Sequence, residues 1–197
     1  MNTGTVHIVD DDEAIRDALV WLFQSRRVPT AVFASAEEFL AARDHRWTGC
    51  LLLDIRMDGM SGLELFDRLG KLGCTLPVIF LTGHGDVPVA VAALKKGARD
   101  FVEKPFNDND LVDRVIEALA ADRRSREEDR SSVNSRLAGL SGREREVMDR
   151  VLAGKLNKQI ADELGIAMRT VEVHRANVFT KMGVRTAVEL AGLLAQR

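Results

Sequence analysis

The stretch VHIVDDDEAIRDALVWLF, residues 6–23, sets a mostly apolar run directly before three carboxylates and a segment of helical length. An apolar run that ends in a polar cluster is typical of a buried strand reaching the edge of a sheet. Adjacent carboxylates repel one another and raise each other's pKa unless a cation or water relieves them. Asp10, Asp11 and Asp12 are therefore either the hydrated start of a helix or half of a metal site.

Short apolar runs alternate with amphipathic segments of helical length through the first 120 residues. This alternation is typical of an α/β fold with a doubly wound parallel sheet. It predicts five strands, at Val6–Val9, Ala31–Phe33, Cys50–Leu53, Val78–Leu81 and Asp100–Glu103. Ser-x-x-Glu capping boxes predict helix starts at Ser35 and Ser61, and Asp86 with Pro88 predicts another start, in a helix that Gly97 ends.

The composition indicates a folded protein without a membrane-spanning segment. Hydrophobic residues make up 46% of the 197 residues and charged residues 29%, enough for one large or two small domains. No apolar run approaches the roughly 20 residues of a membrane helix, and the N-terminus lacks a signal segment. Cys50 and Cys74 belong to no CxxC motif, so we expect free thiols, a reducing compartment and a cytoplasmic location.

Charge divides the chain into two parts. Residues 1–120 carry 13 Lys/Arg and 19 Asp/Glu, whereas residues 121–197 carry 15 and 11, so the net charges are −6 and +4. Such a split is typical of an acidic module joined to one that faces nucleic acid. We predict domains over 1–120 and 137–197. Between them, residues 121–136 are polar and mixed in charge, and form either a linker or a solvated extension of the preceding helix.

Polar side chains follow four of the predicted strands at the point where each strand ends. Asp10 and Asp11 follow the first strand, Asp54 the third, Thr82 the fourth and Lys104 the fifth. Because ligands of an open parallel sheet bind beyond the carboxyl ends of its strands, we expect these groups to lie together. An acid, a hydroxyl and an ammonium at one edge indicate a phosphoryl site, in which Thr82 and Lys104 hold phosphoryl oxygens.

The chemistry that suits these groups is phosphoryl transfer to a carboxylate, with Asp54 as the nucleophile that forms an acyl phosphate. The incoming phosphoryl group is anionic, so a divalent cation is needed to offset the repulsion. Mg²⁺ prefers oxygen ligands and binds one or two carboxylates together with phosphate and water. We expect Asp11 and Asp54 to bind it directly, Asp10 through water and Arg56 through its backbone carbonyl.

Four motifs at these strand ends make residues 5–120 resemble a response-regulator receiver domain: VDDD (9–12), LLLDIRM (51–57), FLTGHGD (80–86) and GARDFVEKPF (97–106). The resemblance implies a flavodoxin-like fold with strand order 2-1-3-4-5 and phosphorylation of Asp54 by a sensor histidine kinase. It also implies a cis Lys104–Pro105 peptide bond. Phe101 takes the place of the family's switch aromatic, which turns inward as Thr82 moves toward the phosphate.

Three positions beside the expected site modify this picture. By resemblance, Arg56 and His84 occupy positions that tune the lifetime of the phosphoryl group, although His84 alone is equally typical of a solvated turn residue. After Met57 the family usually has proline, whereas this chain has Asp58. We expect Asp58 to add flexibility and negative charge beside the site.

Two other interpretations compete for the first domain. Phosphatases of the haloacid-dehalogenase type use a D-x-D pair that Asp10 and Asp12 imitate. That family has Thr or Val where Ala14 stands, however, and its last acidic motif follows the lysine, whereas Asp54 precedes Lys104. The chain could also be a regulator whose receiver is a dimerisation scaffold, but a scaffold has no need of a lysine and a threonine beside the acid.

From Ser141, which forms a third capping box with Glu144, the pattern is helical only. Helices predicted over 157–164 and 169–182 are separated by Gly165-Ile166-Ala167, the spacing of a helix-turn-helix motif, whose second helix enters the DNA major groove. A helical wheel puts Val171, Val178 and Met182 on the core face. We expect DNA contacts from Arg169, Thr170, Glu172, Val173 and Ala176, with Lys158, Arg175 and Lys181 flanking them at phosphates.

A protein-binding helical hairpin with solvated charges would show much of the same pattern. However, REREV (143–147), NKQIADELGI (157–166) and RTVEVHRANVFTKMGV (169–184) make residues 137–197 resemble a LuxR-type DNA-binding domain. Together with the receiver this indicates the NarL/FixJ subfamily, with a small all-α helix-turn-helix domain. Ala167 stands where that family usually has a capping Ser, so we expect the recognition helix to fray at its start.

The two resemblances together imply a phosphorylation-controlled transcription factor that uses Mg²⁺ and catalyses only its own phosphorylation and dephosphorylation. Phosphorylation is expected to promote homodimerisation and binding to double-stranded promoter DNA, with RNA polymerase as a further candidate partner and no membrane partner. The candidate dimer face consists of Ala90, Val91, Leu94, Lys95 and Arg99. Some of these must be core residues, because Ala90, Val91 and Leu94 have helical spacing.

Overall fold

The computed structural model describes residues 4–42, 47–83 and 87–195, which form two compact units, Met1–Ser125 and Arg126–Arg197. The predicted positions His84 and Asp86 lie outside the described residues, as do the side chains of Val87 and Ala90. None of the described helices is long and apolar enough to cross a membrane.

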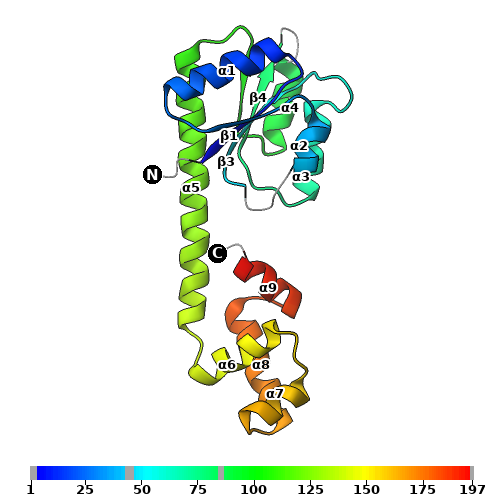
Figure 1. The fold of residues 1–197 in the computed structure, drawn as a ribbon, viewed down its shortest axis with the longest axis vertical. Helices are drawn as coiled ribbons and strands as arrows, with labels where there is room; N and C mark the ends of the chain where they lie inside the picture. Colours follow the sequence, from blue (N-terminus) through cyan, green and yellow to red (C-terminus); the bar gives the residue numbers. More distant parts are fainter. Residues whose placement is uncertain (1–3, 43–46, 84–86, 196–197) are drawn as a thin grey trace. The chain divides into compact units, whose positions relative to one another are not determined.

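A five-stranded parallel sheet forms the centre of the first unit, in the order β2-β1-β3-β4-β5. Strands β1, β3 and β4 of this sheet are labelled in Figure 1. The strands are β1 (Thr5–Val9), β2 (Thr30–Phe33), β3 (Gly49–Asp54), β4 (Val78–Thr82) and β5 (Asp100–Glu103). Each agrees with its predicted range to within one residue at either end, and the flavodoxin-like strand order is confirmed. All six residues of β3 are buried, as expected for a central strand covered on both faces.

Helices cover both faces of this sheet because side chains of each strand alternate between them. Val6, Ile8 and Leu52 lie in a core with α1 (Glu13–Ser25) and the first turns of α5 (Asp108–Ala138). Val9, Leu51 and Leu53 lie in the opposite core. That core contains side chains of α2 (Ala36–Ala42), α3 (Gly62–Lys71) and α4 (Val87–Lys95).

The ends of these helices follow from their sequence. The predicted box at Ser61 and Glu64 is complete and begins α3. At the start of α2, Glu38 N–H donates to Ser35 Oγ, and the Glu38 carboxylate accepts from Ala34 N–H. Gly62 lies so close to the end of β3 that a Cβ atom there would be 2.0 Å from the Asp54 carbonyl oxygen.

Helix α5 runs through the segment predicted as a linker. Its 31 residues end at Ala138. Of the two predicted alternatives for residues 121–136, the extension of the preceding helix is therefore the correct one. Asp122, within this segment, is buried, and its Oδ2 accepts from Gly49 N–H at 2.9 Å. The helix is therefore anchored to the sheet beyond the predicted domain boundary at residue 120.

The second unit is helical, with α6 (Gly142–Leu152), α7 (Asn157–Leu164), α8 (Met168–Met182) and α9 (Ala187–Ala195). The box predicted at Ser141 and Glu144 is complete. The predicted core residues Val171, Val178 and Met182 are buried, together with residues of α6, α7 and α9. At the start of α8 the N-cap Ala167 makes no side-chain hydrogen bond, whereas Gly183 ends the helix in the left-handed conformation.

Candidate functional site

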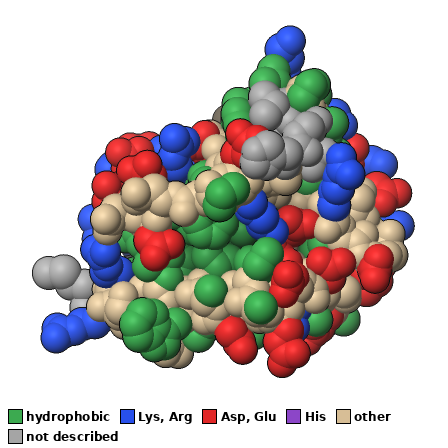
Figure 2. Space-filling model, turned by 90° about the horizontal axis from the view of Figure 1, so that it is seen from above, with side chains coloured by type: hydrophobic (Ala, Val, Ile, Leu, Met, Phe, Trp, Pro, Cys, Tyr) green, Lys and Arg blue, Asp and Glu red, His purple; other side chains and the backbone are tan. Residues whose placement is uncertain are grey.

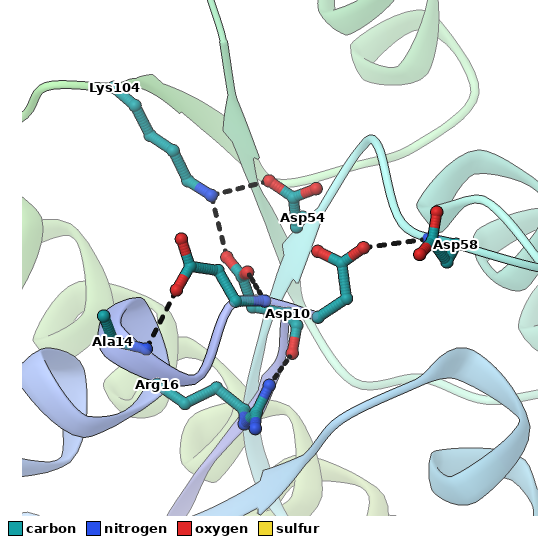
Figure 3. Close-up of polar contacts among 8 residues, drawn as sticks. Asp10, Ala14, Arg16, Asp54, Asp58 and Lys104 are labelled. Carbon is teal, nitrogen blue, oxygen red and sulfur yellow. Dashed lines mark hydrogen bonds and ion pairs between the residues drawn. The ribbon is translucent and has the colours of Figure 1, made fainter.

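The end of the sheet predicted to hold the site brings together an ammonium and two carboxylates (Figure 3). Lys104 Nζ lies 2.7 Å from Asp10 Oδ2 and 2.7 Å from Asp54 Oδ1. The three side chains come from the carboxyl ends of β1, β3 and β5, and the Lys104–Pro105 bond is cis as predicted. The view from above shows acidic side chains gathered beside a hollow on this face (Figure 2).

Burial and charge act against each other in this cluster. Asp10 and Asp54 are only 1% and 6% exposed. Burial raises the pKa of Asp54, and the hydrogen bond and charge of Lys104 oppose that rise. Burial alone would lower the pKa of Lys104, but its hydrogen bonds to Asp10 and Asp54 raise it above its usual value. The lysine therefore stays protonated beside a poorly hydrated carboxylate.

The three consecutive aspartates have different roles. Asp12 is the N-cap of α1 and its side chain accepts from Ala14 N–H at 2.9 Å. Asp10 faces Lys104, and its Oδ1 also accepts from Asp12 N–H. Asp11 Oδ2 accepts from the backbone N–H of Asp58 at 2.9 Å. The helix-start interpretation of the opening stretch is thus confirmed for Asp12, whereas the metal-site interpretation of Asp10 and Asp11 stays a prediction.

Arg16 also belongs to this site and was not predicted from the sequence. Its Nη1 donates to the Asp10 backbone carbonyl at 2.7 Å and so fixes the end of β1 from within α1 (Figure 3). Its position, one turn after the Asp12 cap, was a signal that it faces back toward the strand end.

Thr82 is the last residue of β4, and Phe101 is the second residue of β5. Thr82 is fully buried, and its hydroxyl has no hydrogen-bond partner among the described residues. A buried hydroxyl without a partner is costly, so it suits a ligand that supplies an acceptor. Phe101 is half-buried and packs against the core cluster that contains Phe80.

The donor atoms at this edge suit Mg²⁺ in their chemistry. They are carboxylate oxygens, and with Asp10, Asp11 and Asp54 ionised and Lys104 protonated their net charge is −2, which one divalent cation offsets. In their present positions, however, no group of three or more His, Cys, Asp or Glu side chains within the described ranges is arranged to hold a metal ion. The backbone N–H of Arg56 hydrogen-bonds Asp54, which places the start of the following loop against the carboxylate.

The candidate dimer face is divided between surface and core. Val91, Lys95 and Arg99 are exposed, and Leu94 is half-buried and packs against the core. The side chain of Ala90 lies outside the described residues. The exposed members therefore remain available for an interface.

A second candidate site is the outer face of α8 in the second unit. Arg169, Thr170, Val173 and Ala176 are exposed there, and Lys158 is exposed on α7. Val173 points outward, is 49% exposed and is not part of the core cluster. In a DNA major groove its side chain could pack against a thymine methyl group. Asn177 and Thr180 are exposed on α8 as well, and the helical wheel that selected Val173 would have found them.

Four predicted DNA-contact residues already have partners in this unit. Lys181 Nζ lies 2.7 Å from Glu144 Oε2 and also donates to the Gly139 carbonyl. Arg175 Nη1 donates to Asn157 Oδ1 and its guanidinium lies over the Phe179 ring. Glu172 pairs with Arg169 at 3.3 Å. Arg175 and Lys181 thus join α8 to its neighbours, which spacing along one helix does not reveal.

Both parts of the chain match known protein families. Residues 6–116 match the response regulator receiver domain, and residues 138–194 match the luxR family of bacterial regulatory proteins. The chain is 54% identical over 191 residues to the C4-dicarboxylate transport transcriptional regulatory protein DctR of Rhodobacter capsulatus, covering 95% of this chain and 97% of that one. It is 45% identical to the transcriptional regulatory protein FixJ of Rhizobium meliloti, covering 96% and 94%.

Solved structures show the same similarity over the full chain. The response regulator StyR is 40% identical with a TM-score of 0.63, covering 98% of both chains. Full-length FixJ from B. japonicum is 41% identical with a TM-score of 0.59, covering 98% of this chain and 96% of that one. These matches favour the receiver interpretation over the phosphatase alternative.

Proposed function

Because the chain belongs to the response regulators that join a receiver domain to a LuxR-type DNA-binding domain, as NarL/FixJ-type transcription regulators do, we propose that phosphorylation of Asp54 controls its binding to promoter DNA. The phosphoryl donor is a phosphohistidine on a sensor histidine kinase. The homologues are transcriptional regulators. In this proposal the receiver catalyses only the gain and loss of its own phosphoryl group.

The observation that carries this proposal is the bridging contact of Lys104 with both Asp10 and Asp54, at 2.7 Å each. An ammonium placed between two buried carboxylates is a ready partner for the oxygens of a further anionic group beside Asp54. The adjacent Thr82 hydroxyl, without a partner among the described residues, supplies a donor for a phosphoryl oxygen. Both features suit an anionic group arriving at Asp54.

In the transfer step an Asp54 oxygen forms a bond to phosphorus while the phosphorus–nitrogen bond of the donor histidine breaks. The electron pair returns to the imidazole, which takes up a proton. Lys104 then exchanges its contact with Asp54 for a phosphoryl oxygen, and Thr82 donates to a second one. Asp11 and Asp54, with Asp10 through water and the Arg56 carbonyl, would hold Mg²⁺, whose charge would offset the repulsion between phosphoryl group and carboxylate.

The output follows from a shift between two forms of the receiver. Loss of the Lys104–Asp54 contact and movement of Thr82 and Phe101 favour dimerisation through Val91, Lys95 and Arg99. A dimer presents two α8 helices to half-sites about one turn of DNA apart.

The test uses the full chain with a small-molecule phosphodonor and Mg²⁺. Wild type is expected to gain one phosphoryl group by intact mass, to dimerise by light scattering and to bind promoter DNA more tightly, whereas Asp54→Asn does none of these. Equal dimerisation and DNA binding by the two proteins would overturn the proposal. That result would favour the alternative in which the receiver is a constitutive dimerisation scaffold.

A further inference from the structure

The loop between β3 and α3, residues 55–61, is held by side chains of two other segments. Asp58 N–H donates to Asp11 Oδ2 at 2.9 Å, and Met60 N–H donates to Glu37 Oε1 at 3.2 Å. The Met57 and Met60 side chains are buried on the core side of the same loop. The backbone beside the candidate site is therefore fixed from the Asp11 strand end and from α2.

The bond from Asp58 depends on the residue type at this position. Proline has no backbone N–H, so a chain with the family's usual proline here cannot donate to Asp11 in this way. The sequence predicts that Asp58 loosens the turn. In the structure its main chain instead makes a hydrogen bond, and the bond ends on a side chain that is an expected metal ligand.

A hydrogen bond to one oxygen of a carboxylate sets the direction of the other. Asp11 is exposed, so without a partner its side chain would rotate freely. A carboxylate has two oxygens with about four lone-pair positions, so a single N–H at Oδ2 leaves Oδ1 for a cation. Partners that orient a metal ligand typically change metal affinity by 10–100-fold.

We propose that Asp58 is a positioning residue that acts through its backbone N–H, and that Glu37 supports it by holding the same loop. The Asp58 carboxylate has no part in this role. This inference rests on the proposed function, since it concerns the cation that the Asp54 chemistry uses. Compared with a chain that has proline at this position, this chain orders Asp11 before the cation binds.

The probe is Mn²⁺ alone, which takes octahedral oxygen sites as Mg²⁺ does, with free Mn²⁺ measured by electron paramagnetic resonance. The variants of the full chain are Asp58→Pro, which removes the N–H, and Asp58→Ala, which keeps it and removes the carboxylate. We expect Asp58→Pro to bind Mn²⁺ about tenfold more weakly than wild type and Asp58→Ala to match wild type. Mg²⁺ must displace the bound Mn²⁺ in each case.

A second pair of variants decides the matter if proline disturbs folding, because proline also restricts Met57 before it. Glu37→Ala removes the acceptor for Met60 N–H, and Glu37→Gln keeps an oxygen there. Glu37→Ala is expected to weaken Mn²⁺ binding and Glu37→Gln to restore it. Trp21 and Trp47 both lie in the first unit, so urea unfolding followed by fluorescence verifies that each variant keeps its fold.

Four outcomes separate the possibilities. Equal Mn²⁺ affinity in wild type and Asp58→Pro, or an equal loss in Asp58→Ala and Asp58→Pro, would overturn the positioning role while leaving the Asp54 proposal intact. Unchanged affinity in Glu37→Ala would show that holding this loop does not affect cation binding, and would also overturn the positioning role. If Asp11→Asn and Asp54→Asn bind Mn²⁺ as wild type does, the cation site itself is wrong and the proposed function fails with it.

Discussion

Glu144 shows how one carboxylate can join two helices of the second unit. It closes the capping box at the start of α6, and its Oε2 lies 2.7 Å from Lys181 Nζ on α8. The hydrogen bond from Lys181, together with those from Ser141, lowers the pKa of Glu144 to about 2. Since the usual value is 4.5, protonation of Glu144 favours the unfolded chain.

This pair therefore contributes stability that is present above about pH 4.5 and is lost as the pH falls toward about 2. In Lys181→Met the pKa of Glu144 should rise toward its usual value, and the acid-dependent part of the stability should shrink. Carboxyl chemical shifts of Glu144 by NMR and acid unfolding by circular dichroism measure both effects. An unchanged Glu144 titration in Lys181→Met would show that the capping hydrogen bonds alone hold the carboxylate ionised.

His7 in β1 is a base where Glu144 is an acid, but it too makes the fold less stable as the pH falls. Burial lowers its pKa below 6.5, against a hydrogen bond to the Thr48 carbonyl, and its ring stacks on Trp47 with 4.6 Å between centroids. The folded state thus disfavours the protonated imidazole, so stability falls as the pH drops below about 6.5. Urea unfolding of wild type between about pH 7.5 and pH 5.5 should show this loss. His7→Phe should show less of it, since phenylalanine keeps a ring and does not titrate.

At the scale of elements, the strands were predictable and the end of α5 was not. Apolar runs bounded by polar residues are local, which is why CLLLD locates β3 to within one residue. The contact of Asp122 with Gly49 spans 73 positions. The polar, mixed-charge sequence around Asp122 therefore gave no local sign that this acid is buried. The same reason explains why spacing on α8 identified Arg175 and Lys181 as basic residues beside the outer face but not their bonds to Asn157 and Glu144.

The anchoring of α5 leads to a prediction for the first unit. Asp122→Ala leaves the buried Gly49 N–H without its acceptor, which should lower the free energy of unfolding by about 1–3 kcal/mol. Asp122→Asn keeps an oxygen acceptor and should cost less. Urea unfolding followed by tryptophan fluorescence reports the first unit, which holds both tryptophans. Equal stability of Asp122→Ala and wild type would mean that water replaces the carboxylate.

At the start of α8 a substitution is predicted to increase stability. Ala167 provides no side-chain cap, so Ala167→Ser should stabilise the helix by about 0.5–2 kcal/mol. In DNA-free protein, amide exchange at Arg169–Val171 should be faster than at Val178 in wild type and should slow in Ala167→Ser. Wild-type protection at Arg169–Val171 equal to that at Val178 would contradict the expected fraying.

At the scale of the whole molecule, the chain joins a receiver domain to a LuxR-type DNA-binding domain. The proposed dimer interface of the receiver can be tested separately from its phosphorylation. Val91 is 40% exposed on α4 and belongs to the candidate dimer face. Val91→Arg should weaken phosphorylation-dependent dimerisation by about tenfold, or 1.4 kcal/mol, because two like charges would meet across a symmetric interface. Asp54 should still accept a phosphoryl group, as measured by intact mass. Undiminished dimerisation would exclude this face.

The closeness of Gly62 to the Asp54 carbonyl has a consequence for mutational scanning. A library that varies residue 62 and selects for signalling should retain glycine alone. Any larger side chain would displace the backbone of Asp54, the proposed phosphoryl acceptor. Such a screen would rank this position among the most sensitive in the receiver, although it contributes no reactive atom. Intolerance to substitution at residue 62 would then reflect the lack of space between two backbone segments and not a chemical role.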